Sequence, residues 1–408
     1  MTKGCRPHLM LWIAIALSFT IVSCDRDQPC PEGRTCGDLG QRGDLGIVWE
    51  AATGLDFEVY GRPNGAAILH GGFLYLPVYR REGFGVELIK FDAEDGTFVD
   101  RWVADFRTGL SSERAHVRDG HLYFVRREAA LHAINLATME SAWDMEIEGG
   151  ARLDFQVIGR EAILRTGRSD IIAVDLESRA IRRLGSAPII DPGVFGINPT
   201  PVAYVDEGGA VNTVSLDRDG DDVFLVRQRP LATASSQPAT VYRQRVPGIS
   251  RPSARPFAVQ VTGDFAVVND VRHVSVHRLS DGTPLWDETF ATNGGNIGDP
   301  NLQGNLLLFG RSPVSMRDVA TGRSGHLPAA HDNFEISHDY ALRIGDHLWF
   351  GPYPFDLRTG THLPGWQAYR GPWGDPELPF RGLPTPDEAA GVLYFVDVET
   401  IHCVRLPE

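Results

Sequence analysis

A strand pattern recurs eight times along this chain, at a spacing of about 40 residues. Each copy holds an apolar strand that begins near Gly-x-Leu-Tyr, a short polar gap, and a second apolar strand that ends near Asp-x-x-Thr-Gly. The residues four positions before the turn glycine, or their equivalents, are Asp92, Asn135, Asp175, Leu216, Arg278, Asp318, Asp356 and Arg405. These positions lie 38 to 49 residues apart, except for Leu216 and Arg278, which are 62 apart.

A repeat of this length that consists of strands alone predicts a β-propeller with one blade for each copy. We predict an all-β fold, a single eight-bladed β-propeller of four-stranded antiparallel blades, over residues 46–408. The last copy stops before its outer strand, and Gly46-Ile47-Val48-Trp49 resembles the outer strand of the other copies. We therefore expect residues near 46–52 to pair with the last blade and close the ring, because closure removes two unpaired sheet edges.

Several copies carry a tryptophan after the turn. These are Trp102, Trp143, Trp286 and Trp366. A side chain of this size buries much apolar area, so we expect the four to pack between neighbouring blades. The alternative is an exposed aromatic platform for a ligand.

The interval of 62 residues contains an insertion at 228–257, which is rich in Pro, Ser and Arg and has no acidic residue. We expect it to leave the propeller as a long loop, with a hairpin at Thr240–Val246. It is the basic segment of an acidic chain, which makes it the first candidate for partner contact. The alternative is a solvated loop.

The N-terminus has the pattern of an export signal, which we assign to residues 1–23. Lys3 and Arg6 precede an uncharged stretch of 15 residues, Leu9 to Ser23. That length suits a signal peptide and is short of the roughly 20 residues of a membrane span. The stretch ends in Ile21-Val22-Ser23-Cys24, which resembles the bacterial lipobox. The resemblance implies that Cys24 becomes the acylated N-terminus; ordinary secretion and an uncleaved anchor are the alternatives.

Residues 24–45 are polar and contain several glycines, so we interpret them as a tether. Cys30 and Cys36 flank a short loop within it, and export to an oxidising compartment favours a disulfide between them. Cys403 lies in an apolar strand and is expected to be a buried thiol. We thus place the protein in the bacterial cell envelope, anchored by lipid at a periplasmic or surface face; the sequence does not decide between inner and outer membrane.

The repeats resemble the pyrroloquinoline-quinone-type propeller repeat. Leu131-His132-Ala133-Ile134-Asn135 and Ile172-Ala173-Val174-Asp175 match its core, and the resemblance covers residues 46–408. A lipoprotein made of one such propeller is similar to the BamB family, scaffolds of outer-membrane β-barrel assembly. The resemblance implies a non-catalytic lipoprotein that binds envelope proteins, including β-barrel assembly components, with the membrane reached through Cys24.

Similar repeats also build quinoprotein dehydrogenases, which typically carry adjacent cysteines that this chain lacks. The sequence also has no haem-attachment, zinc-protease, serine-hydrolase or P-loop motif. We predict no enzyme activity, no catalytic residue and no cofactor. A quinone-dependent or other propeller enzyme, or a small-ligand sensor that uses the central channel, stays open as an alternative.

We predict no metal site, although two clusters are candidates for one. Asp217, Asp219 and Asp221 resemble the start of a calcium loop, but Leu225 and Gln228 occupy later ligand positions, so an acidic turn is the alternative. His331, Asp332, His338, Asp339 and His347 form a looser set without strict metal-ligand spacing, for which polar loop residues are the alternative. The net charge of −14 argues against duplex nucleic acid as a partner.

Overall fold

The computed structural model describes most of the residues from Ile47 onward. The described residues are 47–56, 60–63, 65–80, 85–104, 110, 114–126, 130–166, 170–186, 202–229, 239–248, 258–270, 272–289, 300–309, 314–325, 341–350, 353–361, 363, 369–370, 376–377, 384–396 and 399–406. The chain divides into two units, residues 1–38 and 39–408, and only the second contains described residues. All regular structure within that described part is β-strand, and no helix there is long and apolar enough to cross a membrane.

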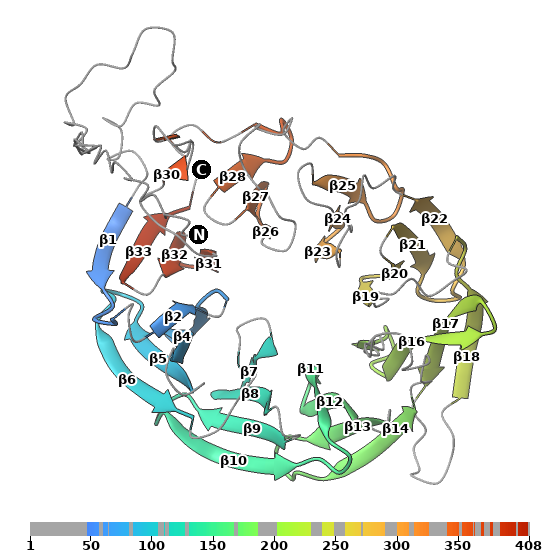
Figure 1. Cartoon of the computed structure of the whole chain (residues 1–408), viewed down its shortest axis with the longest axis horizontal. Helices are drawn as coiled ribbons and strands as arrows, with labels where there is room; N and C mark the ends of the chain where they lie inside the picture. Colours follow the sequence, from blue (N-terminus) through green and yellow to red (C-terminus); the bar gives the residue numbers. More distant parts are fainter. Residues whose placement is uncertain are drawn as a thin grey trace, which may run out of the picture. The chain divides into compact units, whose positions relative to one another are not determined.

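The described strands form eight antiparallel blades arranged around a ring, as predicted (Figure 1). Blade one contains β2 (Tyr60–Pro63), β3 (Ile68–His70), β4 (Phe73–Arg80), β5 (Val86–Asp92) and β6 (Phe98–Val103). Blade two contains β7 (His116–Arg118), β8 (His121–Arg126), β9 (Ala130–Asn135) and β10 (Glu140–Glu146). Blade three contains β11 (Ala151–Ile158), β12 (Glu161–Thr166), β13 (Asp170–Asp175) and β14 (Ile181–Ser186). Blade four contains β15 (Val202–Val205), β16 (Val211–Asp219), β17 (Asp222–Arg229) and β18 (Ala239–Arg245).

The second half of the ring follows the same plan. Blade five contains β19 (Ala258–Thr262), β20 (Phe265–Asn269), β21 (His273–Arg278) and β22 (Pro284–Thr289). Blade six shows β23 (Asn301–Gln303), β24 (Leu306–Phe309) and β25 (Ser315–Asp318), and blade seven shows β26 (Ala341–Ile344), β27 (His347–Phe350) and β28 (Tyr353–Asp356). Blade eight contains β31 (Pro384–Asp387), β32 (Val392–Val396), β33 (Thr400–Arg405) and β1 (Ile47–Ala52). A separate short hairpin consists of β29 (Tyr369–Arg370) and β30 (Pro376–Glu377).

The N-terminal strand closes the ring, which confirms the prediction. β1 pairs antiparallel with β33, from Ile47 opposite Val404 to Ala52 opposite Thr400. The last blade therefore receives its outer strand from the start of the propeller unit. Closure in this way leaves no open end in the array of blades.

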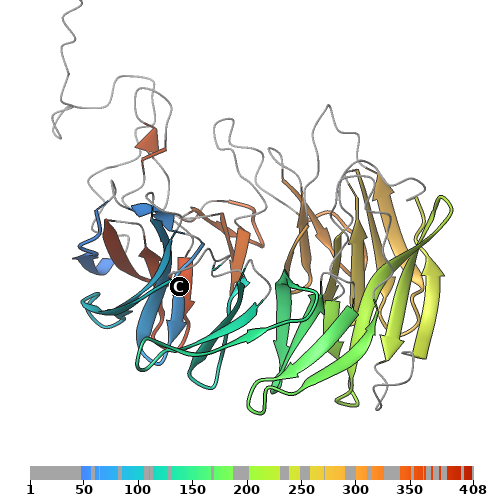
Figure 2. The same ribbon diagram turned by 60° about the horizontal axis from the view of Figure 1, so that its bottom comes forward.

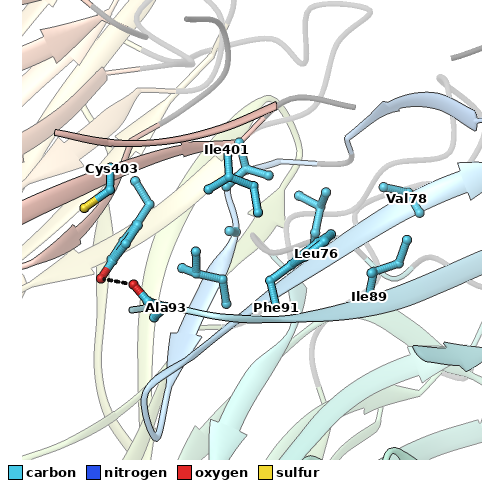
Figure 3. Close-up of a cluster of buried hydrophobic side chains, with 11 residues drawn as sticks. Leu76, Val78, Ile89, Phe91, Ala93, Ile401 and Cys403 are labelled. Atoms are coloured by element: carbon cyan, nitrogen blue, oxygen red, sulfur yellow. Dashed lines mark hydrogen bonds between the residues drawn. The ribbon is translucent and has the colours of Figure 1, made fainter. Parts of the chain in front are cut away.

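The core lies between blades, because each blade is covered on both faces by its neighbours. The middle strands are accordingly buried almost throughout, as in β5 and β9, whereas an outer strand such as β10 is largely exposed. Figure 3 shows the cluster between blades eight and one, where Ile401 and Cys403 from β33 face Leu76, Ile89 and Phe91 of blade one. In the same cluster Tyr394 donates a hydrogen bond from its hydroxyl to the backbone carbonyl of Ala93 (3.0 Å).

Aromatic residues on the outer strands pack against the turn of the next blade. A Cβ added to Gly96 would lie 2.7 Å from Cζ3 of Trp49, and one added to Gly322 would lie 3.0 Å from the indole of Trp286. Trp286 also donates from Nε1 to the carbonyl of Val319, at 2.8 Å. These contacts confirm the inter-blade packing predicted for Trp286.

Of the other predicted tryptophans, Trp102 is 6% exposed and packs in the cluster between blades one and two. Trp143 packs in the cluster between blades two and three. Trp366 lies outside the described residues.

Blade four differs from its predicted form. Leu216 lies in the second strand, β16, and the position equivalent to the other third-strand ends is Arg229. The dipeptide Asp219-Gly220 belongs to the turn between β16 and β17, where Asp219 pairs with Asp222. The interval of 62 residues therefore came from counting to the wrong turn.

The insertion at 228–257 also needs correction, because its middle part does not leave the propeller. Residues Ala239–Arg245 form β18, the outer strand of blade four, which pairs with β17 rather than folding into a separate hairpin. Figure 2 shows β18 alongside β17 at the edge of the ring. Residues 230–238 and 249–257 lie outside the described residues.

Candidate functional site at the rim of the propeller

The outer strands of the blades form the rim of the propeller. In most of the described outer strands, the pairing with the third strand is interrupted near the start of the outer strand. In five blades a β-bulge near the start of the outer strand leaves one residue without a cross-strand partner. These residues are Val48, Val99, Ala142, Val241 and Leu285. A bulge twists a strand and disrupts its ladder, which is one way in which proteins protect exposed sheet edges from pairing with other chains.

Exposed apolar side chains gather on two of these outer strands. Seven large hydrophobic side chains are exposed among the described residues, and four of them lie on β1 and β6. Val48 is 49% exposed on β1, and Phe98, Val99 and Val103 on β6 are 55%, 43% and 44% exposed. The strands adjoin, because Trp49 and Ala51 of β1 contact Gly96 in the turn before β6. We call these four residues the seam patch, since they lie where the ring closes.

A second rim feature is a polar network between blades one and two. His132 on β9 is 3% exposed, and its two ring nitrogens contact two residues of β10. Nε2 lies 3.2 Å from Oγ of Ser141, and Nδ1 lies 3.4 Å from Oδ1 of Asp144. Trp102 of blade one donates from Nε1 to the same Ser141 oxygen, at 3.0 Å. Oδ2 of Asp144 also pairs with Arg126, at 3.2 Å.

The β-bulge at Ala142 assembles this network. Ser141 stands opposite Ile134, and Asp144 stands opposite His132. Without the extra residue, a regular ladder would place Trp143 opposite His132 instead. The bulge therefore puts the hydroxyl and the carboxylate on the same face of the blade as the imidazole, while Trp143 turns to blade three.

Histidines on the third strand of two other blades also contact the outer strand. Nδ1 of His402 lies 2.8 Å from Oε1 of Glu50 in blade eight. Nδ1 of His273 lies 2.8 Å from Oγ1 of Thr289 in blade five. A third-strand histidine thus contacts the outer strand in three blades, and His402, opposite Glu50 next to the bulge, occupies the position equivalent to His132.

The acidic cluster of blade four is part of an ion-pair network. Nε of Arg243 lies 2.8 Å from Oδ2 of Asp217, and its Nη2 lies 3.9 Å from Oδ2 of Asp219. Asp221 lies in the turn between β16 and β17. The described residues contain no group of three or more His, Cys, Asp or Glu side chains placed to hold a metal ion. The structure thus brings Asp217 and Asp219 to one arginine, Arg243.

The basic character of the inserted segment is balanced in the same way. Arg245 pairs with Asp222 at 2.7 Å, and Arg229 lies 4.0 Å from Asp206. Together with the pairs of Arg243, these contacts offset the positive charge of β17 and β18. The described part of the segment therefore presents mixed charge, not the basic patch that its composition predicted.

Polar side chains on the innermost strands bond the neighbouring blade. Gln260 donates to the carbonyl of Pro300 at 2.6 Å, and Asn301 donates to that of Ala341 at 2.7 Å. Thr385 donates from its hydroxyl to the carbonyl of Ala67, at 2.9 Å. These groups around the centre of the ring hold successive blades together.

Several predicted site residues lie outside the described residues: Cys24, Cys30, Cys36, His331, Asp332, His338 and Asp339. His347 begins β27, and Cys403 is a free, buried thiol, as expected. The seam patch and the Ser141 network were not predicted. The sequence of β6, Phe98–Val103, places apolar residues on both sides of Asp100 and Arg101 without alternation, and nothing in the sequence marks the bulge that joins Ser141 to His132.

Comparison with known proteins supports the fold. No protein-family model matches the chain, and no curated protein matches it. Among solved structures, the chain is similar to the computationally designed protein Ika8, with a TM-score of 0.55 and 9% identity over 88% of this chain and 100% of that one. It is also similar to BamB from Moraxella catarrhalis, with a TM-score of 0.52 and 11% identity over 88% of this chain and 99% of that one. At these identities the likeness shows a BamB-like propeller fold.

Proposed function

We propose that this chain is a lipid-anchored scaffold of the bacterial cell envelope, which binds other envelope proteins through the rim and loops of its propeller. The proposed partners include components of outer-membrane β-barrel assembly. The role requires binding and no chemistry at the central channel. Three kinds of support bear on it: the lipobox-like sequence at Cys24, the BamB-like fold and the seam patch.

The seam patch is the observation that supports binding most directly. Four exposed apolar side chains gather on two adjoining outer strands, where water contact is unfavourable and a partner would bury them. The blade behind β6 is closely packed, because β5 is buried almost throughout and Trp102 is 6% exposed. An apolar surface carried by a packed strand can bind a partner without the entropy cost of ordering a loop.

Site-specific photo-crosslinking in cells tests this proposal. A photoreactive residue at Val103, in the seam patch, should form adducts with an envelope protein that mass spectrometry identifies. The matched control is Ile181, which is 48% exposed on β14 and stands apart from the patch. Adducts from Val103 and none from Ile181 support the proposal. No adduct from either position, or the same adducts from both, would contradict it.

The anchor is tested separately, by the fate of Cys24. Substitution of Cys24→Ala should abolish incorporation of labelled fatty acid and release the protein from the membrane fraction. Retention of label in that variant would refute acylation at Cys24. This outcome leaves the crosslinking test intact, so anchoring and binding can fail independently.

A further inference from the structure

The network of Ser141, His132 and Asp144 supports an inference that goes beyond the scaffold role and does not rest on it. We propose that Ser141 is an activated nucleophile, with His132 as its general base, and that it takes the acyl group of an uncharged carboxylic ester. Asp144 orients His132. Nucleophilic serines are recognised by this geometry of three groups rather than by their order in the sequence.

The hydrogen-bond partners fix the direction of each bond. An ionised carboxylate only accepts, so the nitrogen of His132 that faces Asp144 must be the one that carries the proton. Nε2 of the neutral ring is then an acceptor, and the hydroxyl of Ser141 must donate to it. Trp102 only donates, so the same Ser141 oxygen accepts its N–H. The chain of bonds runs from indole to hydroxyl to imidazole to carboxylate, with every group in a permitted role.

The imidazole is held in one orientation by its surroundings. The ring of His132 lies 5.5 Å from that of Trp102 and 5.0 Å from that of Phe124, measured between centroids. It is 3% exposed, whereas Ser141 beside it is an exposed residue. The base is therefore shielded from water and the nucleophile faces the solvent, which is the arrangement that a reactive serine needs.

The reaction would proceed in two balanced steps. Ser141 Oγ attacks the ester carbonyl carbon while its proton passes to Nε2 of His132, and that proton then leaves with the departing alcohol as the bond between acyl carbon and ester oxygen breaks. Water next attacks the acyl-serine, gives a proton to His132, and releases the carboxylic acid as the proton returns to Ser141. The N–H of Trp102 stabilises negative charge on Oγ as its proton departs.

The charge around the serine indicates the class of ester. Glu140, Asp144 and Glu146 are exposed along β10, and Arg126 pairs with Asp144. A negative field of this kind repels phosphate and carboxylate groups near the reacting atom. The site therefore favours an ester that carries no negative charge.

Reaction with a fluorophosphonate probe tests the proposal, because attack by serine on phosphorus displaces fluoride and leaves a stable adduct. Peptide mass spectrometry of the full-length protein should place the adduct on Ser141. Ser141→Ala should abolish that adduct, and His132→Asn should slow labelling by about 100-fold or more, since loss of a general base typically costs 10²–10⁴-fold. Hydrolysis of p-nitrophenyl acetate should likewise be abolished by Ser141→Ala and slowed by His132→Asn.

Ser178→Ala is the matched control. Ser178 is also exposed, and its hydroxyl donates to Oδ1 of Asp175, at 2.9 Å, rather than to a histidine. Labelling of Ser141 should be unchanged in that variant. Asp144→Asn should slow labelling while Ser141 remains the labelled residue, which separates loss of orientation from loss of fold. Absence of an adduct on Ser141, or equal labelling rates with and without His132, would overturn the proposal.

Discussion

Ring closure by β1 can be tested with a pair of alanine substitutions. Gly96 and Gly120 lie in tight turns and have nearly the same positive φ, +75° and +72°. A Cβ on Gly96 would lie 2.5 Å from Cβ of Ala51 and 2.7 Å from Cζ3 of Trp49, both on the closing strand. A Cβ on Gly120 would meet nothing within 4 Å. Gly96→Ala and Gly120→Ala therefore impose the same backbone strain, and only the first disturbs the seam.

The expected losses in the free energy of unfolding follow from the backbone strain and, for Gly96→Ala, from the added contact with β1. Left-handed backbone costs a residue with a Cβ about 1–2 kcal/mol, which is the whole expected loss for Gly120→Ala. Forcing a methyl group into a packed contact adds about 1–3 kcal/mol. Gly96→Ala should therefore lower the free energy of unfolding by about 2–5 kcal/mol. The difference between the two variants measures the contact of blade one with the closing strand.

Urea unfolding monitored by circular dichroism provides the measurement, with the shift in midpoint converted through a common slope. Equal losses in the two variants would refute the reasoning, because they would mean that β1 does not pack on the turn of blade one. A larger loss for Gly120→Ala would refute it as well.

Four further predictions concern single groups and pH. Trp286→Phe should cost about 1–3 kcal/mol in urea unfolding, because the buried carbonyl of Val319 loses its donor. Burial raises the pKa of the Cys403 thiol to about 11, so it should resist a thiol reagent at pH 8 until the protein unfolds, and rapid labelling of folded protein would contradict this. Added calcium should leave the melting temperature unchanged, because Arg243 pairs with Asp217; a calcium-dependent rise would contradict this and favour a metal site at Asp217, Asp219 and Asp221. Hydrogen bonds from backbone N–H groups lower the pKa values of five turn carboxylates, so ionisation of these groups favours the folded state. The free energy of unfolding should therefore be constant above about pH 5 and fall below about pH 4. A free energy of unfolding that does not change on acidification would contradict this. These carboxylates are Asp95, Asp175, Asp206, Asp281 and Asp356.

The fold could be predicted because each blade repeats the same local chemistry. Glycine or its substitute closes the turn between the third and outer strands, and an aromatic residue often follows. Copies that lack the glycine still fold in this way: Met139 and Arg179 occupy the turn position with φ of 53° and 62°. The sequence pattern is harder to recognise in these copies, although the turn has the same left-handed backbone conformation.

Blade four was misread because a turn dipeptide does not say which strands it joins. Asp219-Gly220 closes the hairpin between the second and third strands, a position at which most other blades have a longer connection. The outer strand, Ala239–Arg245, was therefore counted as part of an insertion. Strand pairing, which depends on residues far away in the sequence, decides such a case.

The rim network could not be predicted for a similar reason. His132 and Asp144 are twelve positions apart, and they meet only because Ala142 is bulged out of the ladder. Regular alternation would bring Trp143 to that place. The third participant, Trp102, comes from another blade altogether. Candidate sites of this kind depend on strand register, which is set by packing and not by a local motif.

The most direct test of the closed ring is to remove the strand that closes it. A chain that lacks residues 1–46 should unfold in urea as the full-length protein does. A chain that lacks residues 1–52 should lose stability throughout the propeller, because β33 loses its partner strand, Tyr394 loses the Trp49 ring 6.1 Å away, and His402 loses Glu50. If the two truncated chains unfold at the same urea concentration, β1 does not close the propeller.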